Sequence, residues 1–277
     1  SGNAAVQTTR DIEHDVTTPE ITIDVVAVDD IINATEDDSP VTISGTTTDV
    51  EDGQIATVIL NGVTYSPVVT AGVWTFDITA LEAQALDASE TITADVSDAS
   101  GNAAVQATRD IEHDVTTPVI TIDVVAVDDI INATEDDSPV TISGTTTDVE
   151  DGQVATVVLN GVTYSPVVTG NVWTFDITAL EAQALDATET ITADVSNASG
   201  NAAVQATRDI EHDVTTPVIT IDVVAVDDII NATEDDSPVT ISGTTTDVED
   251  GQIASITLNG TTYSPIVTGN TWTFDIT

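Results

Sequence analysis

The sequence predicts an all-β protein built from tandem β-sandwich domains, and three observations support this prediction. Val, Ile and Thr are abundant, and β-branched residues favour strands. Apolar and polar residues alternate in short runs, which turn signals separate about every 8–12 residues. Trp74, Trp173 and Trp272 are 99 positions apart, and a repeat of that length has the size of a small independent domain.

The repeat also predicts the domain boundaries. The string SGN occurs at positions 1, 100 and 199, with the same 99-residue step. Because three full periods would need 297 residues and the sequence has 277, it covers the array out of phase. We expect residues 1–16 to be the last strand of a preceding repeat plus a linker, 17–115 and 116–214 to be Ig-like repeats, and 215–277 to be an incomplete one.

Seven strands are expected in each repeat. In the first copy their ranges are 21–25, 41–44, 58–60, 63–69, 74–78, 92–96 and 103–111. Asn61-Gly62 predicts a type I′ hairpin, and residues 80–86 are predicted to form a short helix. Trp74 shares a face with Ile78, which indicates a core position rather than a sugar platform. A seven-strand immunoglobulin-like sandwich is the simplest arrangement with this pattern, although the chain has no Cys pair.

The charge of the chain excludes several classes of function. There are 49 acidic residues against three basic ones, a formal net charge of −46. Nucleic acid and anionic membrane surfaces are therefore not expected as partners. The absence of cysteine excludes disulfides and thiolate metal sites, and no apolar stretch approaches the length that spans a bilayer. Such a charge also opposes compact folding unless cations neutralise it.

The carboxylates gather at four places in each repeat. In the first copy these are the linker with Asp15, the loop 29–38, the loop 49–53 and the loop at Asp98. In a seven-strand sandwich, the loops after the second and sixth strands lie where the chain enters, and the loop after the first strand lies where it leaves. Two acidic faces should then meet at each joint between repeats. Ca²⁺ takes six to eight oxygen ligands, so the sequence predicts calcium at the joints.

Other interpretations of these residues are weaker or remain open. The acidic loops could instead be solvated loops of a salt-adapted protein. An EF-hand is rejected because its twelfth position would be Leu60. His14 and its copies are expected to be solvated linker residues, and Arg109 is expected to form a structural ion pair with a local carboxylate. Paired carboxylates that recur in every copy without a cleft do not indicate catalysis, so no enzyme is predicted.

Several strings resemble a known family, the bacterial Ig-like repeats in the extender regions of giant RTX-type adhesins. In the first copy they are DDIINATE (29–36), VTISGTT (41–47), DVEDG (49–53), LNGVTY (60–65) and SGN (100–102), with a linker DVTTP (15–19). The resemblance implies secretion by a type I system, a role in biofilm formation, and a rod that calcium stiffens. It also implies that a distal tip, carried by other domains, binds the adhesion target.

The resemblance and the loop geometry together designate acidic positions as candidate calcium ligands. In the first copy these are Asp15, Asp29, Asp30, Asp49, Glu51, Asp52 and Asp98. In the second they are Asp114, Asp128, Asp129, Asp148, Glu150 and Asp151, and in the third Asp213, Asp247, Glu249 and Asp250. Asn197 stands where the first copy has Asp98, so one charge is lost there.

Three functions from different classes remain open at this point. The first is a structural extender or stalk of a secreted, cell-surface bacterial adhesin, whose direct partners are the neighbouring repeats of the same chain. The second is a multivalent module that binds carbohydrate or protein. The third is a self-assembling filament or surface-layer-like protein, in which strands add across open edges. Near-identity of the copies favours the first, because identical units add length with little new specificity.

Overall fold

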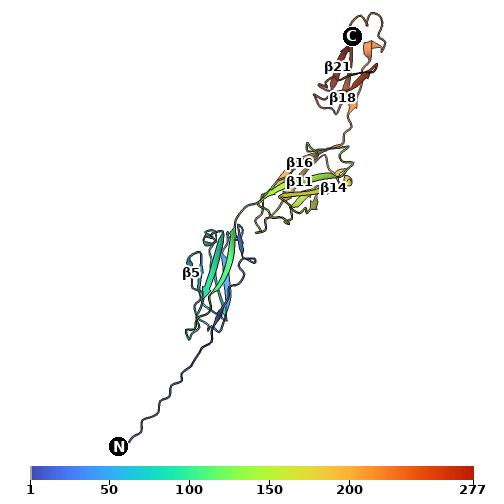
Figure 1. Cartoon of the computed structure of the whole chain (residues 1–277). Helices are drawn as coiled ribbons and strands as arrows, with labels where there is room; N and C mark the ends of the chain where they lie inside the picture. Colours follow the sequence, from blue (N-terminus) through green and yellow to red (C-terminus); the bar gives the residue numbers. More distant parts are fainter. Residues whose placement is uncertain (1) are drawn as a thin grey trace. The chain divides into compact units, whose positions relative to one another are not determined.

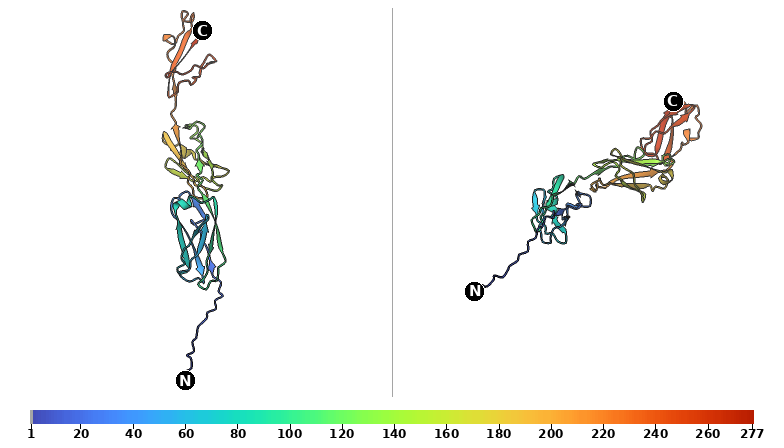
Figure 2. Two further views of the ribbon diagram at one scale, coloured as in Figure 1. Left: turned by 90° about the vertical axis from the view of Figure 1, so that its left-hand side faces the viewer. Right: turned by 60° about the horizontal axis from the view of Figure 1, so that its bottom comes forward.

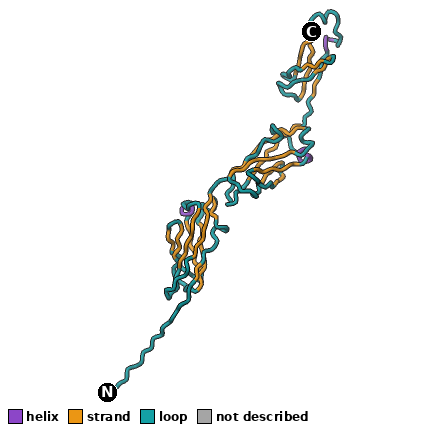
Figure 3. The backbone as a smooth tube through the Cα atoms, in the orientation of Figure 1, coloured by secondary structure: helices purple, strands orange, loops and turns teal. Residues whose placement is uncertain are grey.

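β-strands form nearly all the regular structure of the chain (Figure 3). The computed structural model describes residues 2–277. By the density of internal contacts the chain divides into two compact units. The first unit comprises Ser1–Val124, Thr141–Asp176 and Thr190–Asp209, and the second comprises Val125–Val140, Ile177–Glu189 and Ile210–Thr277. The described helices are three short ones, α1 (Ala80–Ala83), α2 (Ala179–Ala182) and the 3-10 turn η1 (Val224–Val226).

The first copy of the repeat is a two-layer β-sandwich, coloured blue to green in Figures 1 and 2. Its strands are β1 (Glu20–Ile21), β2 (Ile31–Asn33), β3 (Val41–Thr48), β4 (Thr57–Leu60), β5 (Val63–Tyr65), β6 (Val73–Ile78), β7 (Ser89–Asp95) and β8 (Ala107–Asp114). One sheet has the order β1-β3-β6, and the other has the order β2-β8-β7-β4-β5. This is an immunoglobulin-like arrangement and confirms the predicted fold class.

The second copy has the same strand orders. Its strands are β9 (Val119–Ile120), β10 (Ile130–Asn132), β11 (Val140–Thr147), β12 (Thr156–Leu159), β13 (Val162–Tyr164), β14 (Val172–Ile177), β15 (Thr188–Asp194) and β16 (Ala206–Asp213). They form the sheets β14-β11-β9 and β10-β16-β15-β12-β13.

The third copy contains β17 (Val218–Ile219), β18 (Val239–Thr246), β19 (Ile256–Leu258), β20 (Thr261–Tyr263) and β21 (Thr271–Ile276). β17, β18 and β21 form one sheet, and β19 pairs with β20. Residues equivalent to core positions are open to solvent here. Ile230 is 44% exposed, whereas Ile32 and Ile131, its equivalents in the other copies, are fully buried.

The structure differs from the sequence prediction by one additional strand in each of the first two copies. β2 lies inside the segment 29–38, which we expected to be a single acidic loop. It pairs in parallel with β8, so that Ile32 lies opposite His113 and Asn33 opposite Asp114. The side chain of Ile32 is fully buried. A three-residue strand is short for its alternation to be recognised, and its partner lies about 80 residues further along the chain.

A tryptophan in each copy occupies the centre of the sandwich. Trp74 is fully buried, and the core around it includes Ile43, Val58, Ile78 and Ile92. Gly45 makes this packing possible, because a Cβ there would lie 1.9 Å from the Thr22 carbonyl oxygen and 2.5 Å from the Trp74 ring. The prediction that Trp74 belongs to the core is thus confirmed.

Local sequence accounts for the turns. Asn61 and Gly62 both have positive φ, 48° and 70°, as a type I′ hairpin requires. α1 begins after Thr79, whose hydroxyl accepts from the Glu82 amide while the Glu82 carboxylate accepts from the Thr79 amide. This reciprocal capping box explains why so short a helix forms there.

Residues 2–18 are exposed and have no regular secondary structure. Their copies at β8 and β16 pair with strands that precede them in the chain. In this sequence no such strands precede residues 2–18, so the strand expected within 1–16 has no sheet to join.

Candidate functional site at the joint between repeats

The linker carboxylate Asp15 is held by the loop that follows β7. Its Oδ1 accepts from the Thr17 amide at 2.9 Å, and its Oδ2 accepts from the Ser100 hydroxyl at 2.9 Å. The Thr17 amide, followed by the Ser100 hydroxyl, holds the pKa of Asp15 below its ordinary value. The Asp15 carbonyl oxygen accepts from Asn102 Nδ2 at 3.4 Å. The linker and this loop therefore meet at the upstream end of the first repeat.

Asp98 and Glu51 belong to the same end. Asp98 is 4% exposed, and its two carboxylate oxygens accept from the backbone and side-chain nitrogens of Asn102 at 2.7 and 2.8 Å. Glu51 Oε2 accepts from the Ala99 amide at 2.7 Å. Among the described residues no basic side chain pairs with Asp98. A buried carboxylate without a cationic partner is costly.

The other candidate ligands of the first copy lie elsewhere or are engaged elsewhere. Asp52 Oδ1 accepts from the Ala71 amide at 2.6 Å, in the turn before β6. Asp49 is exposed with a positive φ of 55°. Asp29 Oδ1 accepts from the Ile31 amide at 3.1 Å. Neither Asp29 nor Asp30 lies at the downstream end itself, because β2 separates them from Asn33, which is the residue that lies opposite Asp114.

Asp30 forms an ion pair with Arg109. Its Oδ2 accepts from the Arg109 guanidinium, and its Oδ1 accepts from the Val26 amide at 3.0 Å. Arg109 also donates to the Ile23 carbonyl oxygen at 3.0 Å. Arg109 thus forms a structural ion pair with a carboxylate, as expected, and parallel pairing of β2 with β8 decides that this carboxylate is Asp30.

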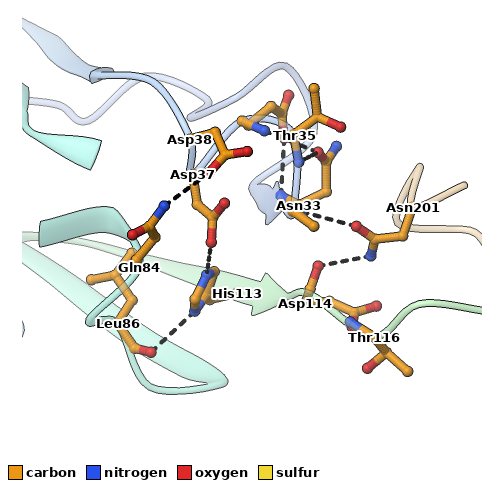
Figure 4. A network of polar contacts seen from close by, with 12 residues as sticks. Asn33, Thr35, Asp37, Asp38, Gln84, Leu86, His113, Asp114, Thr116 and Asn201 are labelled. Atoms are coloured by element: carbon orange, nitrogen blue, oxygen red, sulfur yellow. Dashed lines mark hydrogen bonds and ion pairs between the residues drawn. The ribbon is translucent and has the colours of Figure 1, made fainter. Parts of the chain in front are cut away.

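His113 also corrects an expectation. Its side chain is 8% exposed and lies between two oxygen atoms, with Nδ1 3.0 Å from the Leu86 carbonyl and Nε2 3.1 Å from Asp37 Oδ2 (Figure 4). His212 has the same contacts with Leu185 and Asp136. Both are buried structural residues rather than solvated linker residues, because the strand pairing covers them with the loop that follows β2 or β10. His14 is exposed, as expected.

The upstream end of the second copy uses amides where the first uses a carboxylate. Asn197 is 4% exposed, and its Nδ2 donates to the Thr116 carbonyl at 3.3 Å and to Asp114 Oδ2 at 3.5 Å. Asp114 Oδ1 accepts from the Thr116 amide at 2.9 Å. The Ser199 hydroxyl, followed by Thr116, holds the pKa of Asp114 below its ordinary value. Glu150 Oε2 accepts from the Ala198 amide at 2.7 Å.

Asn201 connects this end to the first copy. Its Nδ2 donates to the Asp114 carbonyl at 2.8 Å, and its Oδ1 accepts from the Ala34 amide at 2.9 Å. Figure 4 shows Asn201 between Asn33 and Asp114. The sequence analysis noted the string SGN but gave Asn201 no role. The signal in the sequence that could have indicated this role is the side-chain amide of Asn201, which directly follows a glycine in a loop near the linker.

The remaining candidate calcium ligands, in the second and third copies, have contacts or backbone conformations like those of their equivalents in the first copy. Asp151 and Asp250 accept from Gly170 and Gly269 at 2.7 Å, and the hydroxyl and amide of Thr215 lower the pKa of Asp213. Asp148 and Asp247 have positive φ, like Asp49. Asp128 Oδ1 accepts from the Ile130 amide, and Asp129 Oδ1 from the Val125 amide. Glu249 is exposed.

Two further observations concern the described part of the chain. Within residues 2–277, no group of three or more His, Cys, Asp or Glu side chains is arranged to hold a metal ion. No helix in the described part of the chain is long and apolar enough to cross a membrane.

The aromatic residues of the first two copies stack on one another. Tyr65 stacks on Phe76 with ring centroids 4.3 Å apart, and its hydroxyl donates to Glu82 at 3.1 Å. Desolvation, followed by Glu82, raises the pKa of Tyr65. Tyr164 stacks on Phe175 in the same way. The fold and the site define an array of immunoglobulin-like β-sandwich repeats joined by polar, hydrogen-bonded linkers.

Comparison with known proteins finds solved structures of bacterial adhesins that this chain resembles. No protein-family model matches the chain, and no curated protein matches it. A structure from a 1.5-MDa bacterial ice-binding adhesin is similar, with 25% identity, a TM-score of 0.49, and coverage of 95% of this chain and 88% of that one. A Ca²⁺-stabilized adhesin of an Antarctic bacterium is 30% identical over 95% of this chain, with a TM-score of 0.49. This chain spans 66% of that structure.

An immunoglobulin-like domain from the M. primoryensis ice-binding adhesin is also similar. It is 34% identical, is covered completely, spans 36% of this chain, and has a TM-score of 0.30. The solved structures that this chain resembles thus include repeats of large bacterial adhesins, which is the class that the sequence analysis named.

Proposed function

We propose that the chain is an extender segment of a secreted bacterial cell-surface adhesin, in which each 99-residue repeat adds length between the cell and a distal binding domain. The observation that carries this proposal is the position of the two linkers in one repeat. Asp15 contacts the loop after β7, whereas Asp114 ends β8 and lies opposite Asn33. β8 has eight residues, so the chain leaves roughly 26 Å from where that strand begins.

Linkers at opposite ends of a repeat suit a spacer, because each further copy can then add its own length to the chain. We propose boundaries at 115/116 and 214/215, so that each repeat folds around its own tryptophan core. Limited proteolysis checks this boundary assignment, because cleavage should concentrate in residues 115–118 and 214–217 rather than inside the sandwiches.

Calcium binding at the upstream ends is the second part of the proposal. Asp15, Glu51 and Asp98 contribute carboxylate oxygens around one loop, and Ca²⁺ prefers such oxygen ligands. Asp98 fits this role best, because it is 4% exposed and pairs with no basic side chain among the described residues. A bound cation would offset the cost of that buried charge and reduce the repulsion created by a net charge of −46.

Thermal unfolding of the full chain in EDTA and across a Ca²⁺ titration, with Mg²⁺ as control, tests this part. Selective binding to the folded state raises stability by about 2.7 kcal/mol at a hundredfold excess over Kd, so Ca²⁺ should raise the melting temperature well beyond the effect of Mg²⁺. An equal effect of both ions, or of plain salt, would overturn the calcium proposal and favour salt adaptation. The spacer role would then be judged by solution scattering alone.

A further inference from the structure

The string Ser-Gly-Asn occurs with identical sequence in the first two copies but has different surroundings. Ser199 is 9% exposed and Asn201 is 3% exposed, whereas Ser100 is exposed and Asn102 is only partly buried. Residues 198–204 repeat residues 99–105 without change, and the nearest difference is Asn197 in place of Asp98. The difference in exposure arises where the preceding copy supplies residues that cover the loop.

The covering residues are Asn33 and Ala34, directly after β2. The Ala34 amide donates to Asn201 Oδ1 at 2.9 Å. Gly200 has φ of +86°, and a Cβ there would lie 3.2 Å from Asn33 Nδ2. The close approach of the Asn33 side chain thus suits a glycine, which also adopts this positive φ without strain.

Asn201 uses its whole side chain in this contact. While Oδ1 accepts from Ala34, Nδ2 donates to the Asp114 carbonyl at 2.8 Å. Its backbone amide donates to Asn197 Oδ1 at 2.8 Å. The acceptor Oδ1 therefore faces the first copy, and the donor Nδ2 faces the linker.

Asn197 determines how Asn201 is used. In the first copy, Asp98 Oδ2 accepts from Asn102 Nδ2 at 2.8 Å, and the bond from Asn102 to the linker carbonyl of Asp15 is longer, at 3.4 Å. Asn197 instead offers its own Nδ2 to Thr116 and Asp114. Asn201 Nδ2 is then free to donate to the linker carbonyl at 2.8 Å.

We propose that the loop 197–201 is a docking surface for the loop that follows β2 in the preceding repeat, and that this amide clamp holds the joint without a metal ion. Asn at position 197 specifies the clamp, whereas Asp at the equivalent position 98 gives a loop whose buried charge calls for a cation. The upstream ends of the first and second copies then differ in their dependence on cations, which goes beyond the proposed extender role.

Amide hydrogen exchange of the full chain in EDTA tests the clamp, and the chain contains a matched control. Asn33 and Asn132 each accept from the amides two and three residues ahead, so the local turns are alike. Ala133, however, is exposed and has no hydrogen-bond partner among the described residues. The flanking sequences are identical, so intrinsic exchange rates are equal. Segmental isotope labelling separates the two signals.

We expect Ala34 to exchange roughly fivefold more slowly than Ala133 or slower still, which corresponds to one net hydrogen bond. Asn201→Ala should abolish that difference, and Asn102→Ala should leave it unchanged. Equal exchange of Ala34 and Ala133 in the unmodified chain would overturn the proposal. The result is independent of the calcium titration, since EDTA is present throughout.

Asn197→Asp provides a second variant that keeps the volume of the side chain and the sequence of the first copy. We expect it to accelerate exchange at Ala34 in EDTA by roughly threefold or more, because the new carboxylate competes for Asn201 Nδ2. Asp98→Asn should not affect Ala34. Unchanged exchange in Asn197→Asp would overturn the role of Asn197, and an unchanged near-ultraviolet spectrum of the tryptophans verifies that each variant is folded.

Discussion

His113 and Asp37 form a buried pair, with Nε2 3.1 Å from Oδ2 and both side chains less than 10% exposed. The other ring nitrogen lies 3.0 Å from the Leu86 carbonyl and must donate to it. The pair ties the loop after β2 to β8 and to the segment after α1, next to the linker.

Asp37→Ala should destabilise the first repeat by about 3 kcal/mol, because it leaves a buried ring without its partner. Urea denaturation of the chain measures this loss. Asp38→Ala is the matched control, since Asp38 is exposed and accepts one hydrogen bond from Gln84. It should cost less than about 0.5 kcal/mol. Equal losses in the two variants would contradict a structural role for the pair.

Gly45→Ala should destabilise the same sandwich by about 2 kcal/mol or more, because the added methyl group collides with the Thr22 carbonyl and the Trp74 ring. A red-shifted or broadened tryptophan emission would accompany the loss. Gly2→Ala is the control, because a Cβ at Gly2 meets no atom within 4 Å. Wild-type stability in Gly45→Ala would mean that the core is looser than these distances indicate.

Ile32→Ala and Ile230→Ala should differ greatly although they change equivalent positions. Ile32 is fully buried and Ile230 is 44% exposed. Truncation of a buried isoleucine costs about 2–5 kcal/mol, whereas the exposed position should cost less than about 1 kcal/mol. Denaturant unfolding of the two single variants decides this, and similar losses would argue against the burial difference between the copies.

Glu82 should give the first repeat a dependence on acid. The Thr79 amide, followed by the Thr79 hydroxyl, lowers the pKa of Glu82 below 4.5. A lowered folded-state pKa stabilises the fold above 4.5, and this contribution is lost as pH falls through the folded value. Glu82→Gln should flatten the stability profile below pH 4.5. If the stability of Glu82→Gln falls as steeply with decreasing pH as that of the wild type, Glu82 does not cause the acid dependence.

Tyr65 donates to the Glu82 carboxylate. It should make the stability of the first repeat depend on pH in the alkaline range. Its pKa is raised above 10.0 by desolvation and then by Glu82. A raised pKa of an acid favours the protonated form in the folded state, so this stabilisation is lost as pH rises through the folded value. Tyr65→Phe should weaken the alkaline loss, as measured by unfolding above pH 10.

Asp98→Asn should reduce the calcium-induced rise in melting temperature, if calcium binds as proposed. The variant should remain folded, because Asn197 already occupies the equivalent position with 4% exposure. In EDTA it should be at least as stable as the wild type, since it removes a buried charge without a basic partner. An unchanged calcium response would exclude Asp98 from the site.

The sequence predicted the class of fold and most strands because their signals are local. Alternation in 41–44 and 74–78, the Asn61-Gly62 turn and the 99-residue step each lie within one short segment or one repeated pattern. β2 escaped prediction because its three residues show no clear alternation and its partner is distant. The same parallel pairing decided that Asp30 meets Arg109 and that His113 is buried.

By itself, the sequence determined an acidic, cysteine-free array of β-sandwich repeats and located its polar loops at the linkers. The tertiary structure alone decided which polar atoms meet there. Identical Ser-Gly-Asn strings at 100–102 and 199–201 have different burial. The physical reason is that a hydrogen bond needs both partners within about 3 Å, and the partner of Asn201 is Ala34, which is 167 residues away in the chain.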